Sequence, residues 1–195
     1  VFVCSISSKF SQTLPMLEEL KVHYANRLHI FVYDTKTLNI AEGALAYEAK
    51  VLIEQGESFE NVAKKLDDLR RRSEFLFTLS DLDYIIRNKK LSAPAAFVAN
   101  LFDIKPIMQI NQIGEIVAVE KVRKLEKTLT TMGKTVEKLA ANQPAFIYLT
   151  DTGHHESTEF FKKLLATHFG WHDLPVIRVS TISLANHGLM GTGIG

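Results

Sequence analysis

The chain has 195 residues, of which 46% are hydrophobic and 23% are charged, and its formal net charge is +1. This composition is that of a globular protein of one or two domains, and the near-neutral charge argues against a nucleic-acid partner, which would need a concentrated basic surface. The apolar runs fall short of the roughly 20 residues of a membrane span. The single cysteine, Cys4, excludes an intrachain disulfide framework and suits a reducing compartment, so we expect a cytoplasmic protein.

The first section of the chain alternates between strand and helix patterns. Runs rich in β-branched and aromatic residues predict strands over 1–6 and 27–34. Helical spacing of apolar residues predicts helices over 14–24, 38–55 and 59–72, the last capped by Ser58. Because residues 38–55 are apolar on most faces, we expect that helix to be buried on more than one side. The strand–helix–strand–helix order predicts a parallel α/β sheet.

The pattern changes after Arg72. Short apolar runs predict strands over 75–79, 145–150 and 175–180, and a hairpin-like pair over 105–110 and 115–120 with Gly114 in its turn. Helical patterns fall at 80–87, 93–102, 122–141 and 156–169. A hairpin beside β–α–β elements predicts a second α/β domain with a mixed sheet. We therefore expect two domains, covering 1–72 and 73–195.

The two ends of the chain have unusual patterns. Val1 lies inside a strand pattern, and GTGIG over 191–195 ends the chain in a glycine-rich run. The chain therefore reads as a piece of a longer protein. The glycine run has no following helix to orient a phosphate, so we expect a backbone turn or close packing there.

Motifs for catalysis or metal binding are missing from the sequence. There is no G-x-S-x-G elbow, no Walker loop and no G-x-G-x-x-G after a strand. His154 and His155 are adjacent and would point apart on a helix, while Gly170 separates His168 from His172. The single cysteine excludes most thiolate zinc sites. We expect no catalytic residue, no metal and no cofactor.

A cluster of hydroxyl groups is the most suggestive feature. SISSKFSQT, residues 5–13, joins a strand pattern to a helix pattern, so its hydroxyls could cap the helix or hold an anion. His187 lies in ANHGLMG, which reads as a loop where an imidazole can reach a polar ligand. Arg123 opens the long helix as part of EKVRK, where a cation is unfavourable unless something else holds it. Hydroxyls, arginine and histidine together suit a carboxylate, and the apolar residues suit a hydrocarbon body.

Several of these stretches, taken in order, resemble the DegV family of bacterial fatty-acid-binding proteins. The matching stretches are ISSKFSQT, VYDTKTLNIAEG, DLDYIIRNKKLSAPAAFVANLFDIKPIMQI, GEIVAVEKVRK and ANHGLMG. The resemblance implies two α/β domains with the ligand between them, in which residues 1–72 are the latter part of the first domain. It also implies a set of residues that hold the ligand carboxylate: Ser7, Ser8, Arg123 and His187. Ser8 is favoured over Ser7, and a secondary set comprises Ser11, Lys90 and Gly191.

The sequence departs from the family pattern at several of these positions. The family's G-G-R-I-S is NKKLS here, so Lys90 replaces an arginine and supplies a point charge without the bidentate fork. Leu189 and Met190 replace glycines near the C-terminus, and Gln12 replaces a glycine after the serines. These changes bear on head-group geometry and ligand preference rather than on the fold.

The function implied by the resemblance is that of a binding protein, not an enzyme. A long-chain fatty acid would lie in an apolar tunnel and be presented to a fatty acid kinase, which phosphorylates it to an acyl-phosphate for phospholipid synthesis. Transient contact with a membrane would serve lipid exchange. Two alternatives stay open: an acyl-ester hydrolase or transferase using His187 as base with a serine nucleophile, and a regulatory module with a vestigial pocket.

Overall fold

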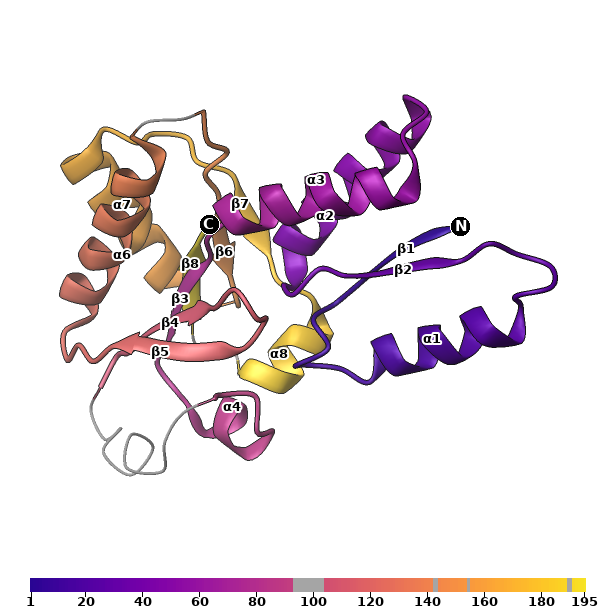
Figure 1. Ribbon diagram of the computed structural model, residues 1–195. Helices are drawn as coiled ribbons and strands as arrows, with labels where there is room; N and C mark the ends of the chain where they lie inside the picture. The colour runs from indigo at the N-terminus through magenta and orange to yellow at the C-terminus, as the bar shows by residue number, and fades with distance from the viewer. Residues whose placement is uncertain (93–103, 142–143, 154, 189–190) are drawn as a thin grey trace. The chain divides into compact units, whose positions relative to one another are not determined.

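The computed structural model describes residues 1–92, 104–141, 144–153, 155–188 and 191–195 (Figure 1). The described residues form two compact units. Unit 1 comprises Val1–Ser73 with Asn111–Glu115, and unit 2 comprises Glu74–Ile110 with Ile116–Gly195. The helix expected over 93–102 lies outside the described residues. None of the described helices is long and apolar enough to cross a membrane.

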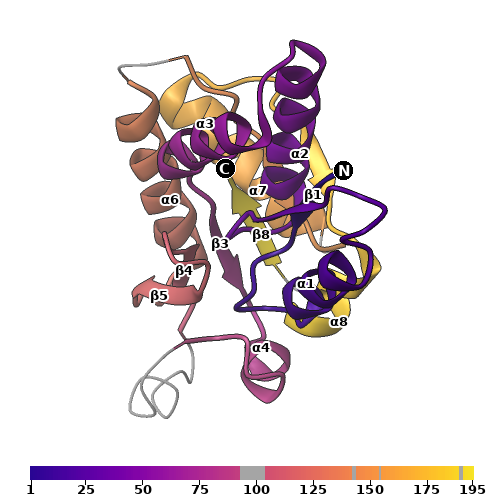
Figure 2. The ribbon, with the colours of Figure 1, turned by 45° about the vertical axis from the view of Figure 1, so that its right-hand side comes forward.

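Unit 1 contains a pair of parallel strands and three helices. Its elements are β1 (Phe2–Ser5), α1 (Thr13–His23), β2 (Phe31–Asp34), α2 (Asn39–Glu54) and α3 (Phe59–Arg72). β1 and β2 pair in parallel, with Phe2 opposite Phe31 and Ser5 opposite Asp34. The expected parallel arrangement is therefore confirmed. Helices α2 and α3 lie on one side of the strand pair and α1 on the other (Figures 1 and 2).

The core of unit 1 lies between its strands and the α2–α3 pair. The buried members are Tyr33, Leu45, Ala49, Leu52, Val62 and Leu66. In α2 the buried residues form one stripe and Tyr47 is exposed, so the expected burial on more than one side is wrong. Ala44 and Tyr47, which contributed to the apolar pattern, are both exposed; alanine favours the helical backbone whether or not it is buried, because it has the highest helix propensity.

The start of α3 follows the sequence prediction. The Ser58 hydroxyl oxygen accepts a hydrogen bond from the Asn61 N–H at 3.3 Å. Just before it, Gly56 adopts a φ of 89°, which ends the preceding helix in a conformation that favours glycine. Both boundary signals are local, which is why they could be read from sequence.

A buried arginine fastens the loops of unit 1. The Arg70 side chain, on a residue only 5% exposed, donates from Nε and Nη2 to the Lys36 carbonyl at 3.2 and 3.1 Å. It also donates from Nη2 to the Asn111 carbonyl at 2.8 Å and from Nη1 to the Ser73 carbonyl at 3.3 Å. One planar guanidinium thus connects the end of α3, the loop after β2 and the 111–115 turn.

Unit 2 is built on a six-stranded mixed sheet in the order β5-β4-β3-β8-β6-β7. Only the β6–β7 pairing is parallel among these described strands, and the expected mixed sheet is confirmed. The strands are β3 (Leu76–Leu79), β4 (Ile107–Ile110), β5 (Ile116–Glu120), β6 (Leu149–Asp151), β7 (Val176–Arg178) and β8 (Gly191–Ile194). The helices are α4 (Asp83–Arg87), α6 (Leu125–Ala140), α7 (His155–Phe169) and α8 (Thr181–His187).

The glycine-rich run at the C-terminus forms the strand β8, between β3 and β6. A Cβ atom at Gly191 would lie 2.6 Å from the Thr78 carbonyl oxygen, and one at Gly193 would lie 2.7 Å from the Thr150 hydroxyl. The expectation of close packing is confirmed, whereas the alternative of a backbone turn is wrong. Glycine is depleted in strands, so sequence propensity pointed away from this one.

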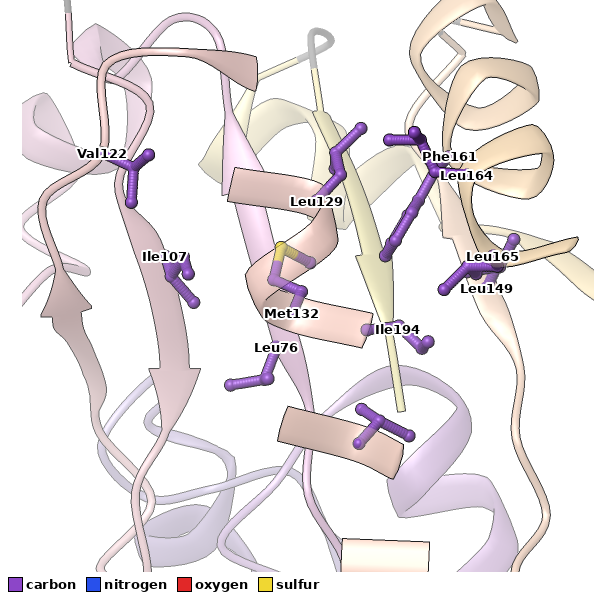
Figure 3. Packing of buried hydrophobic residues seen from close by; sticks show 11 residues of the cluster. Leu76, Ile107, Val122, Leu129, Met132, Leu149, Phe161, Leu164, Leu165 and Ile194 are labelled. Atoms are coloured by element: carbon purple, nitrogen blue, oxygen red, sulfur yellow. The ribbon is translucent and has the colours of Figure 1, made fainter. Parts of the chain in front are cut away.

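Helices α6 and α7 cover one face of the sheet and form the main core with it (Figure 3). The fully buried side chains include Leu129, Met132, Leu149, Phe161 and Ile194. The two helices approach closely at Gly133, where a Cβ atom would lie 2.7 Å from the Phe169 ring. Alternation along the strands then directs Phe75, Phe77 and the glycines of β8 to the opposite face.

Replacing Arg70 with methionine should destabilise unit 1, because methionine keeps an apolar stem but removes the donors to three loop carbonyls. We expect the free energy of unfolding to fall by about 3 kcal/mol in urea denaturation. Hydrogen exchange should also become faster at the paired amides of β1 and β2.

The matched control for this prediction is Arg71→Met. Arg71 is exposed and forms an ion pair with Asp68 on the helix surface. We expect this replacement to change stability by less than about 1 kcal/mol. If Arg70→Met and Arg71→Met lowered the free energy of unfolding equally, the role assigned to Arg70 would be contradicted.

Candidate functional site

The two serines that follow β1 have different surroundings. Ser7 is fully buried; its hydroxyl donates to the Gly114 carbonyl at 2.8 Å and accepts from the Lys9 N–H at 3.2 Å. Ser8 is half-buried, and its hydroxyl donates to Asp34 Oδ2 at 2.6 Å. Ser7 is thus used by the fold, whereas Ser8 keeps part of its surface exposed.

The hydrogen-bond donors at this strand–helix junction are directed at the Asp34 side chain. Its carboxylate accepts from the Ser8 hydroxyl, from the Ser8 N–H at 3.3 Å and from the Lys36 N–H at 2.9 Å. Sequence reasoning expected donors around an anion here, and the structure shows such donors around a carboxylate that belongs to the chain itself. The arrangement arises because parallel β1 and β2 end side by side, with Ser5 opposite Asp34.

The remaining hydroxyls of this loop pair at the start of α1. The Ser11 hydroxyl oxygen accepts from the Thr13 N–H at 3.1 Å and lies 2.7 Å from the Thr13 hydroxyl oxygen. The N-cap position itself is Gln12, whose side chain makes no capping hydrogen bond. Ser11 therefore serves the start of the helix, one residue before the N-cap.

His187 lies at the end of a helix, so its expected place in a loop is wrong. Ser180 caps α8 by accepting from the Ser183 N–H at 3.4 Å, and the helix ends before Gly188, which has a φ of 95°. A capped helix of seven residues was missed because TISLANH is too short to show a helical apolar stripe.

Helix α4 holds the end of α8 in place and brings Lys90 near His187. The Asn88 side-chain amide donates to the Ala185 and Asn186 carbonyls at 3.2 and 3.1 Å. Lys90 lies close enough for its charge to act on the His187 imidazole. These two candidates are therefore neighbours within unit 2.

The His187 imidazole is neutral at physiological pH. Burial, aided by the nearby Lys90 charge, lowers its pKa to about 4, against a smaller opposing effect of a hydrogen bond to the Ser183 backbone. That bond uses a ring N–H, so the second ring nitrogen presents a lone pair. His187 therefore offers a ligand an acceptor rather than a positive charge.

The other candidates of unit 2 are placed differently from the sequence expectation. Arg123 does not open α6, which begins at Leu125, because the segment before it is extended and the Lys105 N–H donates to the Val122 carbonyl. Arg123 is exposed and makes no hydrogen bond or ion pair with the described residues. The Gly191 N–H donates to the Thr152 hydroxyl at 2.7 Å, so Thr152 already uses that donor.

Unit 2 also carries an aspartate–histidine pair that sequence reasoning missed. Asp151 Oδ2 lies 2.5 Å from His155 Nδ1, with the Asp151 side chain 5% and the His155 side chain 74% exposed. Asp151 Oδ1 accepts from the Gly153 N–H at 2.9 Å. The pair occurs where β6 leads into α7. Within the part of the chain that the structure describes, no group of three potential ligands could hold a metal ion.

A row of aromatic side chains lies on the face of the unit 2 sheet opposite α6 and α7; three of its rings are buried and one, Phe146, is exposed. Phe77 stacks on Phe75 at 5.5 Å between ring centroids, Phe75 on Tyr148 at 6.3 Å, and Tyr148 on Phe146 at 5.9 Å. We call these four residues the ring row. A Cβ at Gly193 or Gly195 would lie 3.0 Å or less from the Phe75 or Tyr148 ring, so the glycines of β8 leave room for the rings.

Sequence reasoning grouped residues that the structure distributes over both units. Ser7, Ser8 and Ser11 belong to unit 1, whereas Lys90, Arg123, His187 and Gly191 belong to unit 2. Asp34 was missed as the partner of Ser8, although Asp34 ends β2 and Ser8 follows β1, and parallel strands bring their carboxyl ends to one edge. Cys4 is inert, because burial raises the pKa of its thiol to about 11.

The lowered pKa of His187 predicts a loss of stability in mild acid. Between about pH 6.5 and pH 4 the unfolded chain binds a proton that the folded imidazole does not. The free energy of unfolding should therefore fall as pH drops through this window, by up to about 1.4 kcal/mol per pH unit. Urea denaturation of the wild type and of His187→Gln measures the difference, with the exposed His172→Gln as control. If the free energy of unfolding of His187→Gln changed with pH as steeply as that of the wild type, the prediction would be contradicted.

Comparisons with known proteins identify the family. The family model described as "uncharacterised protein, DegV family" matches residues 1–195. A DegV domain-containing protein of Clostridium perfringens is 24% identical over 195 residues, which is 100% of this chain and 65% of the relative. The fatty acid-binding protein of Thermotoga maritima is 32% identical over 164 residues, which is 82% of this chain and 54% of the relative.

Solved structures share the fold. The fatty acid binding DegV family protein of Streptococcus agalactiae has a TM-score of 0.87 and 25% identity, and the match covers 100% of this chain and 69% of that one. A DegV family protein of Thermus thermophilus, also described as binding fatty acid, has a TM-score of 0.82 at 23% identity, covering 100% and 69%, and shows the fold alone. The matches span 41–65% of the length of these curated relatives. With a mixed α/β fold throughout and a family match over its whole length, the chain belongs to the DegV family.

Proposed function

We propose that the protein binds a long-chain fatty acid and presents it to a fatty acid kinase, which converts the acid to an acyl-phosphate for phospholipid synthesis. The observation that carries the binding proposal is the ring row, which lies over a strand of alternating glycines. Relatives described as fatty-acid-binding support the same class of ligand. In this proposal the protein acts as a cytoplasmic carrier without a cofactor of its own.

The hydrocarbon chain of the ligand supplies most of the affinity in this proposal. Each buried methylene contributes about 0.8 kcal/mol, so a long chain needs an extended apolar surface. The ring row contributes stacked aromatic rings, three of them buried, and Leu79 and Met108 are buried in the same sheet. We propose that the acyl chain is enclosed in an apolar tunnel against this face of the unit 2 sheet.

The head group is assigned to residues that keep accessible polar atoms. Ser8 is preferred to Ser7, because Ser7 is fully buried and bonded to Gly114. Arg123 is exposed and supplies a cation, and His187 supplies a neutral nitrogen. Ser11, Lys90 and Gly191 stay a secondary set, in which Ser11 and Gly191 already bond to neighbouring groups.

The fatty acid kinase and the membrane are the proposed partners. An acid enclosed by protein must be exposed for phosphorylation and exchanged with lipid at some stage. We propose that a kinase performs the first step and that transient membrane contact performs the second. Both proposals rest on the family resemblance.

Binding is tested directly with palmitate and oleate on the delipidated protein, by native mass spectrometry and calorimetry. We expect one bound acid in the wild type and roughly tenfold weaker binding in Phe75→Ser, since stacked ring contact and apolar area are both lost. Phe160→Ser is the matched control, because Phe160 is an exposed residue of α7. Circular dichroism and urea denaturation verify that both variants fold. A wild type that rejects both acids would overturn the proposal.

The kinase step is tested by coupled phosphorylation, with the acyl-phosphate trapped as a hydroxamate. Arg123→Ala and His187→Ala should slow phosphorylation more than they weaken binding, because head-group contacts supply a small part of the affinity. Lys134→Ala, at an exposed position of α6, is the control. Weaker binding with unchanged turnover of the bound acid would contradict the assignment of these two residues.

A further inference from the structure

The hydroxyl proton of Ser8 is already committed within unit 1. A serine hydroxyl has one proton to donate and two lone pairs to accept with. The proton goes to Asp34 Oδ2 at 2.6 Å, and an ionised carboxylate can only accept. The direction of this bond is therefore fixed by chemistry, with Ser8 as donor and Asp34 as acceptor.

The Asp34 carboxylate is itself held by backbone donors. The Ser8 N–H and the Lys36 N–H both point to it, and Arg70 in turn holds the Lys36 carbonyl. These contacts fix the carboxylate in place beside the Ser8 hydroxyl. Ser8 cannot redirect its proton to a ligand without leaving Asp34 one donor short.

A ligand that meets the half-buried Ser8 oxygen therefore encounters lone pairs. An ionised carboxylate brought to it would have no proton to share and would also approach the negative charge of Asp34. The charged groups adjoining the pair are Lys9, next to Ser8 in the chain, then Lys36 and Arg70. On the α2 side Glu42 acts on Cys4 of β1, and burial raises the pKa of this glutamate.

His187 of unit 2, considered by itself, has the same character. Its ring bonds to the Ser183 backbone, and burial together with Lys90 keeps it unprotonated. The remaining ring nitrogen is an acceptor. Two of the head-group candidates therefore offer lone pairs to a ligand, although sequence reasoning had selected them as partners for an anion.

We propose that Ser8 recognises its ligand as a hydrogen-bond acceptor, so that the head group bound there carries an O–H. Two head groups carry such an O–H donor: an un-ionised carboxyl and a hydroxyl. The inference rests on the proposed function and refines the chemistry of its head-group site. Asp34 acts as a positioning residue that sets the direction of the Ser8 hydroxyl.

The test compares three probes of equal chain length: dodecanoic acid, dodecan-1-ol and methyl dodecanoate. The acid and the alcohol can donate an O–H, whereas the ester cannot. In the wild type we expect the alcohol to bind roughly tenfold more tightly than the ester, in line with the penalty for an unmade hydrogen bond. Affinity for the acid should fall by up to about tenfold per pH unit between about pH 6 and pH 8.5, as the un-ionised fraction falls.

Two variants separate the role of Ser8 from that of Asp34. Asp34→Ala frees the Ser8 proton for a bond to the ligand. The difference in affinity between the alcohol and the ester should therefore become smaller, and the affinity for the acid should fall less steeply as pH rises. Ser8→Ala should bind the alcohol and the ester equally, and it keeps the test decisive if Asp34→Ala fails to fold. Leu28→Ala, at an exposed position of unit 1, is the control and should behave as the wild type.

The outcomes distinguish this inference from the function on which it rests. If the wild type bound all three probes with equal affinity at about pH 6 and at about pH 8.5, the requirement for an O–H donor on the ligand would be overturned. Fatty-acid binding itself would be left intact. Failure of all three probes and of palmitate to bind would overturn the proposed function and the inference with it. The inference would also be contradicted if Ser8→Ala kept the same preference for the alcohol over the ester as the wild type.

Discussion

The guanidinium of Arg70 is the constraint on which unit 1 depends. It is a buried charge, and its donors are directed at backbone carbonyls of three separate segments. A buried cation must keep such partners, because leaving it without them is strongly unfavourable. The loop after β2 is therefore held in one conformation, and that loop supplies the Lys36 N–H that fixes Asp34 beside Ser8. The chemistry offered by Ser8 thus follows from an arginine that does not touch it.

Unit 2 depends on a different kind of constraint, the absence of side chains along one face of β8. The threonine and isoleucine of this strand contribute to the opposite face, where Ile194 joins the core formed with α6 and α7 (Figure 3). On the glycine face, the Phe75 and Tyr148 rings take the space that Cβ atoms would need. A single strand therefore contributes to the main core on one side and packs against buried aromatic rings on the other.

The parts of the fold that the sequence predicted well are those with local signals. The Ser58 cap and the Gly114 turn follow from residues close together in the chain, and the parallel β1–β2 pair follows from the strand–helix–strand order. Strand β8 could not be predicted from sequence, because its glycines are required by the close approach of the Thr78 and Leu76 carbonyls of β3, which is a tertiary contact. For the candidate site, residue types indicated polar contacts correctly, but the direction of each hydrogen bond depends on tertiary partners such as Asp34. The resemblance supplied the family, and the geometry supplied the ionisation and hydrogen-bond state of its residues.

The 111–115 turn gives unit 1 a particular order of assembly. The bond from Ser7 to Gly114 spans 107 positions of the chain, and the one from Arg70 to Asn111 spans 41. A nascent chain cannot complete unit 1 until residue 115 has left the ribosome, although its strands and helices end at Arg72. Closing such long loops is slow relative to forming local contacts. Residues 1–73 would therefore wait in a partly assembled state, with Arg70 lacking one of its acceptors, while the first strands of the second sheet are being synthesised.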